Sequence, residues 1–202
     1  MSTKEIFTPE ERLEIFKEEI GLIKSTSIKN YAIGAINSLP NYFFYIPASS
    51  TGKYHPDYAL GDGGLVRHTK VAVRFLVECF RLAWYERISD DDRDLLVVAL
   101  MLHDGWKSGI SHSKYTLDEH PVIAIEQLKN NEEINTLLPS EQLELIYSCI
   151  ETHMGQWNIS KKTFQEFAPV PATSYQKLIH FCDYVASRKL FEANFDYVPT
   201  RS

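Results

Sequence analysis

Four polar residues fall on the apolar faces of segments that have helical spacing. Each has apolar residues three or four positions away, as a side chain that faces a protein core would. A fifth residue, Asp104, comes directly after the apolar run 95–102 and the histidine that ends it. The spacing therefore directs imidazole and carboxylate groups inward, and the four residues on apolar faces are His68, His103, His153 and Asp183.

Buried carboxylates need a compensating partner. A buried carboxylate without one costs several kcal/mol, and arginine and lysine are scarce on these apolar faces. Taken singly, a histidine on an apolar face is usually a hydrogen-bonded core residue, and an aspartate is usually a cap or an ion-pair partner. That explanation would have to hold for every residue, and the adjacent pair His103-Asp104 fits it least. A shared divalent metal would satisfy all of them, because imidazole and carboxylate suit manganese, iron, nickel and zinc.

The composition of the chain favours some classes of protein and disfavours others. The chain has 202 residues, 44% of them hydrophobic, which predicts one core and one domain over residues 1–202. Its net charge of -6 disfavours duplex DNA as a partner and favours small anionic substrates. No apolar run is long enough to span a membrane, so we expect no membrane partner and a cytoplasmic location; a homodimer stays open. The three cysteines lie apart in apolar runs, which predicts reduced core residues.

Apolar periodicity and capping signals predict an all-α fold of about six to eight helices. Residues 1–40 should hold N-terminal helices, and residues 54–190 the metal-binding core. Between them, the aromatic segment 41–64 is interrupted by proline and glycine, and we expect it to be packed rather than disordered. The expected helices cover residues 9–24, 27–39, 65–86, 91–103, 118–129, 140–153 and 172–191.

The order of the polar residues resembles the HD superfamily, whose signature is a histidine, an HD pair, further histidines and a late aspartate. Here that order is His68, His103-Asp104, His120, His153 and Asp183. The segments 63–69, 102–107 and 183–188 resemble the family's first-histidine, HDxxK and closing segments, so the resemblance spans roughly residues 54–190. The aromatic segment 54–58 is similar to one in bacterial HD-domain 3′-to-5′ exoribonucleases. Those enzymes usually carry an additional nucleic-acid-binding domain, for which this chain has no room.

The resemblance implies a phosphohydrolase with two divalent metals. His68, His103, Asp104 and Asp183 would hold one ion, and His120 and His153 a second that Asp104 bridges. We expect manganese, with iron, nickel, zinc, cobalt and magnesium as alternatives, and a metal-activated hydroxide as the nucleophile. The substrate would be a phosphodiester or phosphomonoester in a nucleotide or a short single-stranded oligonucleotide. In a one-metal variant, His120 and His153 would instead contact phosphate or donate a proton.

Other residues near these motifs are candidates for catalysis and substrate binding. Asp104 and Lys107 are the catalytic candidates, and Lys107 could contact phosphate or be a solvated surface lysine. Trp157 could stack on a base, or cover the edge of the core. His112 lies in a polar loop and should face solvent or substrate, whereas His180 should support the site from behind it. The predicted substrate-binding residues are Lys107, Arg67, Trp157, Lys161 and Arg188.

Two other functions use the same ligand order. HD-superfamily members that resemble inositol oxygenase hold two irons with four histidines and two aspartates, so a di-iron oxygenase is one alternative. A non-catalytic nucleotide-binding module is the other. The intact set of ligands argues against the binding module, because a protein without catalysis has no physical need to pair buried charges through a metal.

Overall fold

The computed structural model describes residues 6–53 and 55–189, and it confirms the all-α prediction. Those ranges contain nine α-helices and no strand, with one isolated bridge between Ile159 and Glu166. The helices are α1 Pro9–Ile15, α2 Lys17–Leu22, α3 Thr26–Ser38, α4 Gly64–Cys79, α5 Asp90–Leu102, α6 His120–Lys129, α7 Glu132–Asn135, α8 Ser140–Thr152 and α9 Ser174–Ala186.

The first expected helix is two helices. Thr8 and Glu11 form the expected capping box at the start of α1. The chain then leaves helical geometry at Phe16, whose φ is -101° and ψ 15°. That break turns the Phe16 ring into the core, where its centroid lies 6.1 Å from that of Phe43 and 6.5 Å from that of Phe44. The prediction of one helix over 9–24 was wrong because burial of this ring outweighs helix continuity.

The aromatic segment before α4 is packed, as expected. Its 3₁₀ turn η1, Asn41–Phe44, buries three consecutive aromatic residues. The segment also fixes the start of α4, because the amide of Leu65 donates to the Ile46 carbonyl at 2.9 Å. Gly64 lies so close to the same segment that a Cβ atom there would come within 2.2 Å of the Ala59 carbonyl oxygen. The first turn of α4, which leads to His68, is therefore held against the aromatic segment.

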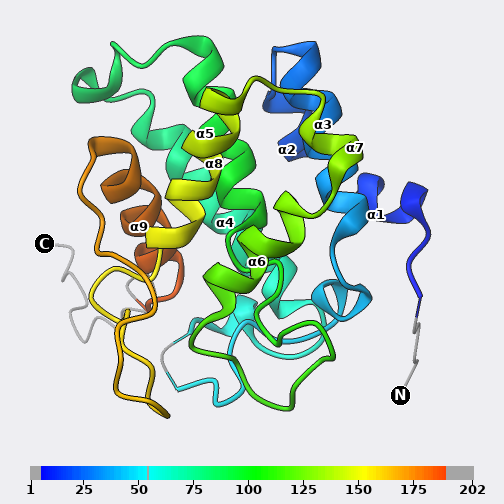
Figure 1. Ribbon diagram of the computed structural model, residues 1–202, viewed down its shortest axis with the longest axis vertical. Coiled ribbons are helices and arrows are strands. Elements are labelled where there is room, and N and C mark those ends of the chain that lie inside the picture. The colour runs from blue at the N-terminus through cyan, green and yellow to red at the C-terminus, as the bar shows by residue number, and fades with distance from the viewer. Residues whose placement is uncertain (1–5, 54, 190–202) are drawn as a thin grey trace, which may run out of the picture.

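The core is built mainly from α4, α5, α8 and α9, with α4 packed on α9 and α5 packed on α8. Every residue from Leu95 to Leu102 is buried, which explains the uninterrupted apolar run in α5. In Figure 1, the first residues of α4 and α6 and the last residues of α5, α8 and α9 are directed toward the lower end of the molecule. The loops 103–119 and 153–173 gather at that same end (Figure 1). Residues far apart in sequence thus converge there.

Several boundaries differ from the expected ones. The helix expected over 65–86 ends at Cys79 and is followed by the 3₁₀ turn η3, Ala83–Tyr85. Arg93 holds this turn by stacking over the Phe80 ring and donating to the Tyr85 carbonyl. The short helix α7 was not expected, and residue 54 and residues 190–202 lie outside the described residues. None of the described helices is long and apolar enough to cross a membrane.

A buried ion pair connects α2 to α4 and allows a stability prediction. Glu19 is 2% exposed, and Lys70 pairs with it while also donating to the Ile15 carbonyl. Lys70→Met should lower the free energy of unfolding by about 3 kcal/mol, because the Glu19 carboxylate stays buried without its partner. Urea denaturation followed by circular dichroism measures this change. Adding Glu19→Leu to the same protein should recover most of the loss, and a double variant as unstable as the single one would contradict the explanation.

Candidate metal centre

Six predicted ligands come together from five helices. His68 lies within α4 and Asp183 within α9, while His103 and His153 cap the C-terminal ends of α5 and α8. Asp104 follows His103, and His120 is the first residue of α6. All are at most 2% exposed except Asp183, whose side chain is 18% exposed. Their ligand atoms form two groups, each within 4.8 Å: His68, His103, Asp104 and Asp183; and Asp104, His120 and His153.

The first group is built around two carboxylates. The Asp183 Oδ1 atom lies 2.9 Å from His68 Nε2 and 3.4 Å from His103 Nε2. The Asp104 Oδ2 atom lies 3.7 Å from His68 Nε2 and 3.5 Å from His103 Nε2. Two imidazole nitrogens and two carboxylate oxygens thus face one small volume, a donor set that suits a divalent transition metal.

The second group uses the other oxygen of Asp104. Its Oδ1 atom lies 3.0 Å from His120 Nε2 and 3.7 Å from His153 Nε2. The two Nε2 atoms are 3.1 Å apart. One carboxylate therefore presents Oδ2 to the first group and Oδ1 to the second, which is the arrangement a bridging ligand between two ions requires.

Three of the histidines are oriented in the same way. The Nδ1 atom of each lies close to the backbone carbonyl three residues earlier, and because a carbonyl oxygen only accepts, Nδ1 carries the proton. When such an imidazole is neutral, its Nε2 atom has a lone pair that faces the centre, as in a metal-binding imidazole. The pairs are His103 with Leu100 at 2.6 Å, His120 with Leu117 at 2.7 Å and His153 with Ile150 at 2.7 Å.

These contacts fit divalent ions. His103 Nε2 is buried and has no hydrogen-bond partner among the described residues, although it faces two carboxylates. With Nδ1 protonated, the Nε2 lone pairs of His120 and His153 face each other at 3.1 Å. This contact is repulsive unless the two imidazoles share a cation. The residues present therefore match the group of ions that the donor set predicts.

Ionisation in the centre follows from the same contacts. Burial by itself would raise the pKa of Asp104, but Lys107, His103 and His120 together hold it well below its usual range. Burial would lower the pKa of His103, yet the Asp104 and Asp183 carboxylates outweigh burial and raise it to about 10. Burial, reinforced by the neighbouring imidazoles, lowers the pKa of His153 to about 4. The Asp104 and Asp183 carboxyl groups are therefore ionised and are stabilised by nearby positive charge, whereas the His153 imidazole is neutral at neutral pH.

Comparison with known proteins agrees with this geometry. The HD domain family model matches residues 76–188, which is more than half of the chain. The chain belongs to the HD-domain family. HD domains are typically metal-dependent hydrolases, and five of the six candidate ligands described above lie within the matched range. His68 lies before residue 76, so the HD-domain match alone does not include it, and the structure supplies it from α4. No curated protein and no solved structure matches this chain.

His55 is a neighbour of the centre that the sequence analysis did not single out. Its ring packs edge-on against His68 with centroids 5.5 Å apart. Its Nδ1 atom is buried and has no hydrogen-bond partner in the described part of the chain. Burial, together with the charges of Lys107 and His68, lowers the pKa of His55 to about 3. A neutral imidazole therefore lies against His68. The signal for His55 in the sequence was its place in the aromatic segment before His68.

Lys107 lies beside the centre. Its ammonium forms an ion pair with Asp104 Oδ2, and its side chain is only 12% exposed. A solvated surface lysine is therefore not what the structure contains. The position suits a contact with a phosphoryl oxygen, which remains a prediction.

The other predicted substrate contacts occupy three different surroundings. The Arg67 guanidinium donates to the carbonyls of three residues in the 58–62 turn, so its observed contacts hold that turn. Trp157 stacks on Tyr184 with centroids 5.7 Å apart, and Arg188 lies 4.4 Å above the Tyr184 ring. Lys161 has an 89% exposed side chain and pairs with Asp118 at 3.4 Å. Substrate binding by these residues stays a prediction.

His180 is hydrogen-bonded to the backbone of a candidate ligand, as its position in the sequence predicted. Its Nδ1 atom donates to the His153 carbonyl at 2.7 Å. The ring also covers Gly155, which has a φ of 58° and whose Cβ position would lie 2.2 Å from the His180 ring. A side chain at Gly155 would therefore displace His180 and disturb the turn that carries His153.

Gly155→Ala should lower the free energy of unfolding by about 2 kcal/mol and weaken metal binding by the second group, because left-handed backbone and a steric clash act together. Thermal denaturation and metal titration measure the two effects. Gly21→Ala is the control, since Gly21 lies in α2 with open space around its Cβ position. That variant should gain about 0.5 kcal/mol. Normal stability and metal binding in Gly155→Ala would contradict the packing argument.

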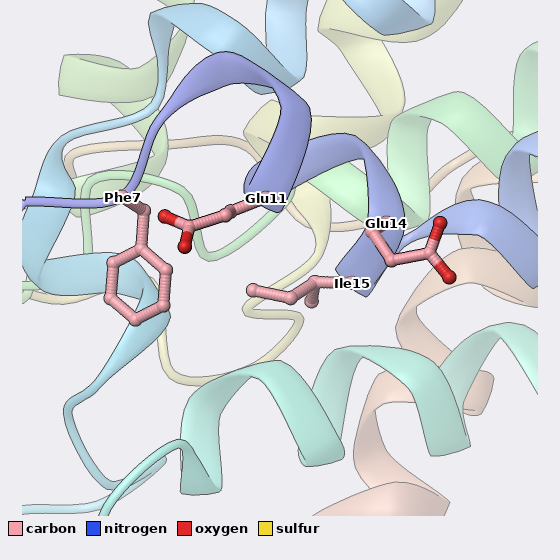
Figure 2. Close-up of a pocket in the computed structure, with 4 residues that line it drawn as sticks. All are labelled: Phe7, Glu11, Glu14 and Ile15. Atoms are coloured by element: carbon pink, nitrogen blue, oxygen red, sulfur yellow. The ribbon is translucent and has the colours of Figure 1, made fainter.

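A separate hollow of about 400 Å³ lies beside α1 and is lined by Phe7, Glu11, Glu14 and Ile15 (Figure 2). None of the six candidate ligands lines it. Its charged groups are carboxylates, and Figure 2 shows that those of Glu11 and Glu14 point away from each other. This hollow has no group that attracts phosphate, so it is not a candidate for the substrate site.

Proposed function

We propose that this protein is a metal-dependent phosphohydrolase that cleaves a phosphodiester or phosphomonoester in a nucleotide or a short single-stranded oligonucleotide. The observation that carries the proposal is the divided orientation of Asp104, whose two oxygens face two separate groups of imidazoles. Membership of the HD-domain family supports hydrolysis as the reaction. Bound in the two groups, divalent ions would activate water for attack on phosphorus and neutralise charge on the phosphoryl oxygens.

The chain's own residues orient the reaction. His103, His120 and His153 hold their Nε2 atoms inward through their Nδ1 bonds to backbone carbonyls. Lys107 places a positive charge next to Asp104 and would attract a phosphoryl oxygen. The net charge of -6 favours a small or short substrate over a long nucleic acid. Manganese is the ion that we propose to occupy the centre.

The test combines metal content with activity. Protein purified without chelator should contain about two equivalents of transition metal by mass spectrometry. It should then hydrolyse bis-p-nitrophenyl phosphate or a nucleotide in the absence of oxygen when manganese is supplied. A folded protein that binds no metal after reconstitution would overturn the proposal. Turnover that requires oxygen would instead support the di-iron oxygenase.

A further inference from the structure

A second cavity lies next to Lys107, outside the metal centre. It has a volume of about 130 Å³, and no acidic residue lines it. Its lining offers positive charge and hydroxyl groups from two loops, 46–50 and 107–116. We call it the flanking-phosphate pocket, and its polar residues are Lys107, His112, Lys114, Ser50, Ser108, Ser113 and Thr116.

The wall that carries His112 is held in a defined conformation. His112 has a φ of 55°, which a residue other than glycine rarely adopts. Its ring stacks on Tyr42 with centroids 4.7 Å apart and an interplanar angle of 19°. The Tyr42 hydroxyl also donates to the Gly109 carbonyl at 2.6 Å, which holds the start of the same loop. The imidazole is therefore presented to the pocket by packing, although the residue itself is exposed.

Lys107 connects the pocket to the metal centre. It lines the pocket while its ammonium contacts Asp104, the carboxylate shared by both ligand groups. A substrate whose reacting phosphate lies at the centre would therefore place its next group near this pocket. The loop is closed over Lys107 by the bond from the Leu117 amide to the Lys107 carbonyl at 3.0 Å.

The side chains that line the pocket indicate the kind of group it could bind. Two ammonium groups, an imidazole and several hydroxyls are all able to donate hydrogen bonds, which suits a phosphate group. A volume of about 130 Å³ leaves room for one phosphate group beside these donors.

We propose that the flanking-phosphate pocket binds a second phosphate of the substrate, adjacent to the one that is cleaved. This inference rests on the proposed function and narrows its substrate class to molecules with at least two neighbouring phosphates. The second phosphate belongs either to an oligonucleotide backbone or to a nucleoside polyphosphate.

The experiment compares substrates that differ in phosphate number. The substrates are bis-p-nitrophenyl phosphate, with one phosphate, 5′-phosphorylated thymidine dinucleotide and thymidine triphosphate, each assayed with manganese. The variants are Lys114→Gln and His112→Asn, because asparagine tolerates the left-handed backbone at that position. Lys177→Gln is the matched control, since Lys177 is an exposed lysine in the first turn of α9 and does not line the pocket.

The expected readout is the ratio of kcat/KM for a multiply phosphorylated substrate to kcat/KM for bis-p-nitrophenyl phosphate. This ratio should fall about fivefold in Lys114→Gln and about tenfold in the double variant, and stay at the wild-type value in Lys177→Gln. A fall for the dinucleotide alone identifies an oligonucleotide, and a fall for the triphosphate alone identifies a polyphosphate. Equal effects on all substrates would overturn the inference while leaving the proposed function intact.

A binding measurement separates the two proposals. In chelator-treated protein, inorganic phosphate should shift the His112 imidazole resonance in the NMR spectrum, which the His112→Asn variant assigns by its disappearance. Lys114→Gln should weaken that titration about fivefold. Such a shift supports the pocket even in a protein that hydrolyses nothing, in which case the proposed function fails alone. A His112 resonance that phosphate leaves unmoved would overturn the inference.

Discussion

Asp104→Asn should reduce phosphodiester hydrolysis at least about a thousandfold and lower the metal content of both groups. Asparagine keeps the shape of the side chain but has only one oxygen and no charge, so it cannot face His68 and His103 with one carboxylate oxygen and His120 and His153 with the other. The two groups should therefore lose metal together. Mass spectrometry of the purified variant and a manganese-dependent assay measure the two effects.

Asp94→Asn is the matched control for this prediction. Asp94 lies in the same helix as the run that leads to Asp104 and is 4% exposed. Its Oδ2 atom accepts hydrogen bonds from the amides of Lys24 and Ser25, both at 2.8 Å. The control should lose stability and retain metal. Full metal content in Asp104→Asn would show that Asp104 does not bridge the two groups.

Lys107→Met should lower kcat about a hundredfold and leave the metal content in place, because it removes a positive charge beside the phosphate without removing a ligand. The Asp104 carboxylate also loses a competing cation, so metal affinity should not decrease. Steady-state kinetics and metal titration on the same preparation separate these effects. The separation matters, since a merely structural lysine would affect stability rather than kcat.

Two further variants sharpen the Lys107 prediction. Lys107→Arg should recover only part of kcat, because a planar guanidinium does not replace a compact ammonium at a fixed contact. Lys177→Met, on the exposed first turn of α9, should retain wild-type kcat. A Lys107→Met protein with normal kcat and normal KM would remove Lys107 from the catalytic machinery.

Local sequence patterns were sufficient to predict a helix where the interactions that form the helix lie within it. The capping signal at Thr8 and the apolar run in α5 both predicted helices that the structure contains. The order of histidines and aspartates predicted six candidate ligands, and the structure brings all six into two groups. Periodicity works here because a helix places each side chain at a known angle, so that an inward direction can be read from its neighbours.

Local patterns were insufficient where a distant contact decides the conformation. The break at Phe16 depends on the Phe43 and Phe44 rings, which lie more than twenty residues away in the chain. The short helix α7 follows no strong periodicity. His55 was overlooked because its neighbour His68 approaches it only after the aromatic segment folds back onto α4.

The sequence by itself determined the types and the order of the candidate ligands, and it predicted that they face inward, because these depend on residue identity and local periodicity. Only the tertiary structure decided that the two oxygens of Asp104 separate the ligands into two groups, that Lys107 contacts Asp104, and that the loops carrying His112 and Lys114 enclose a pocket. The physical reason is that these distances depend on how α4, α5, α6, α8 and α9 pack against one another, and no single segment contains that information.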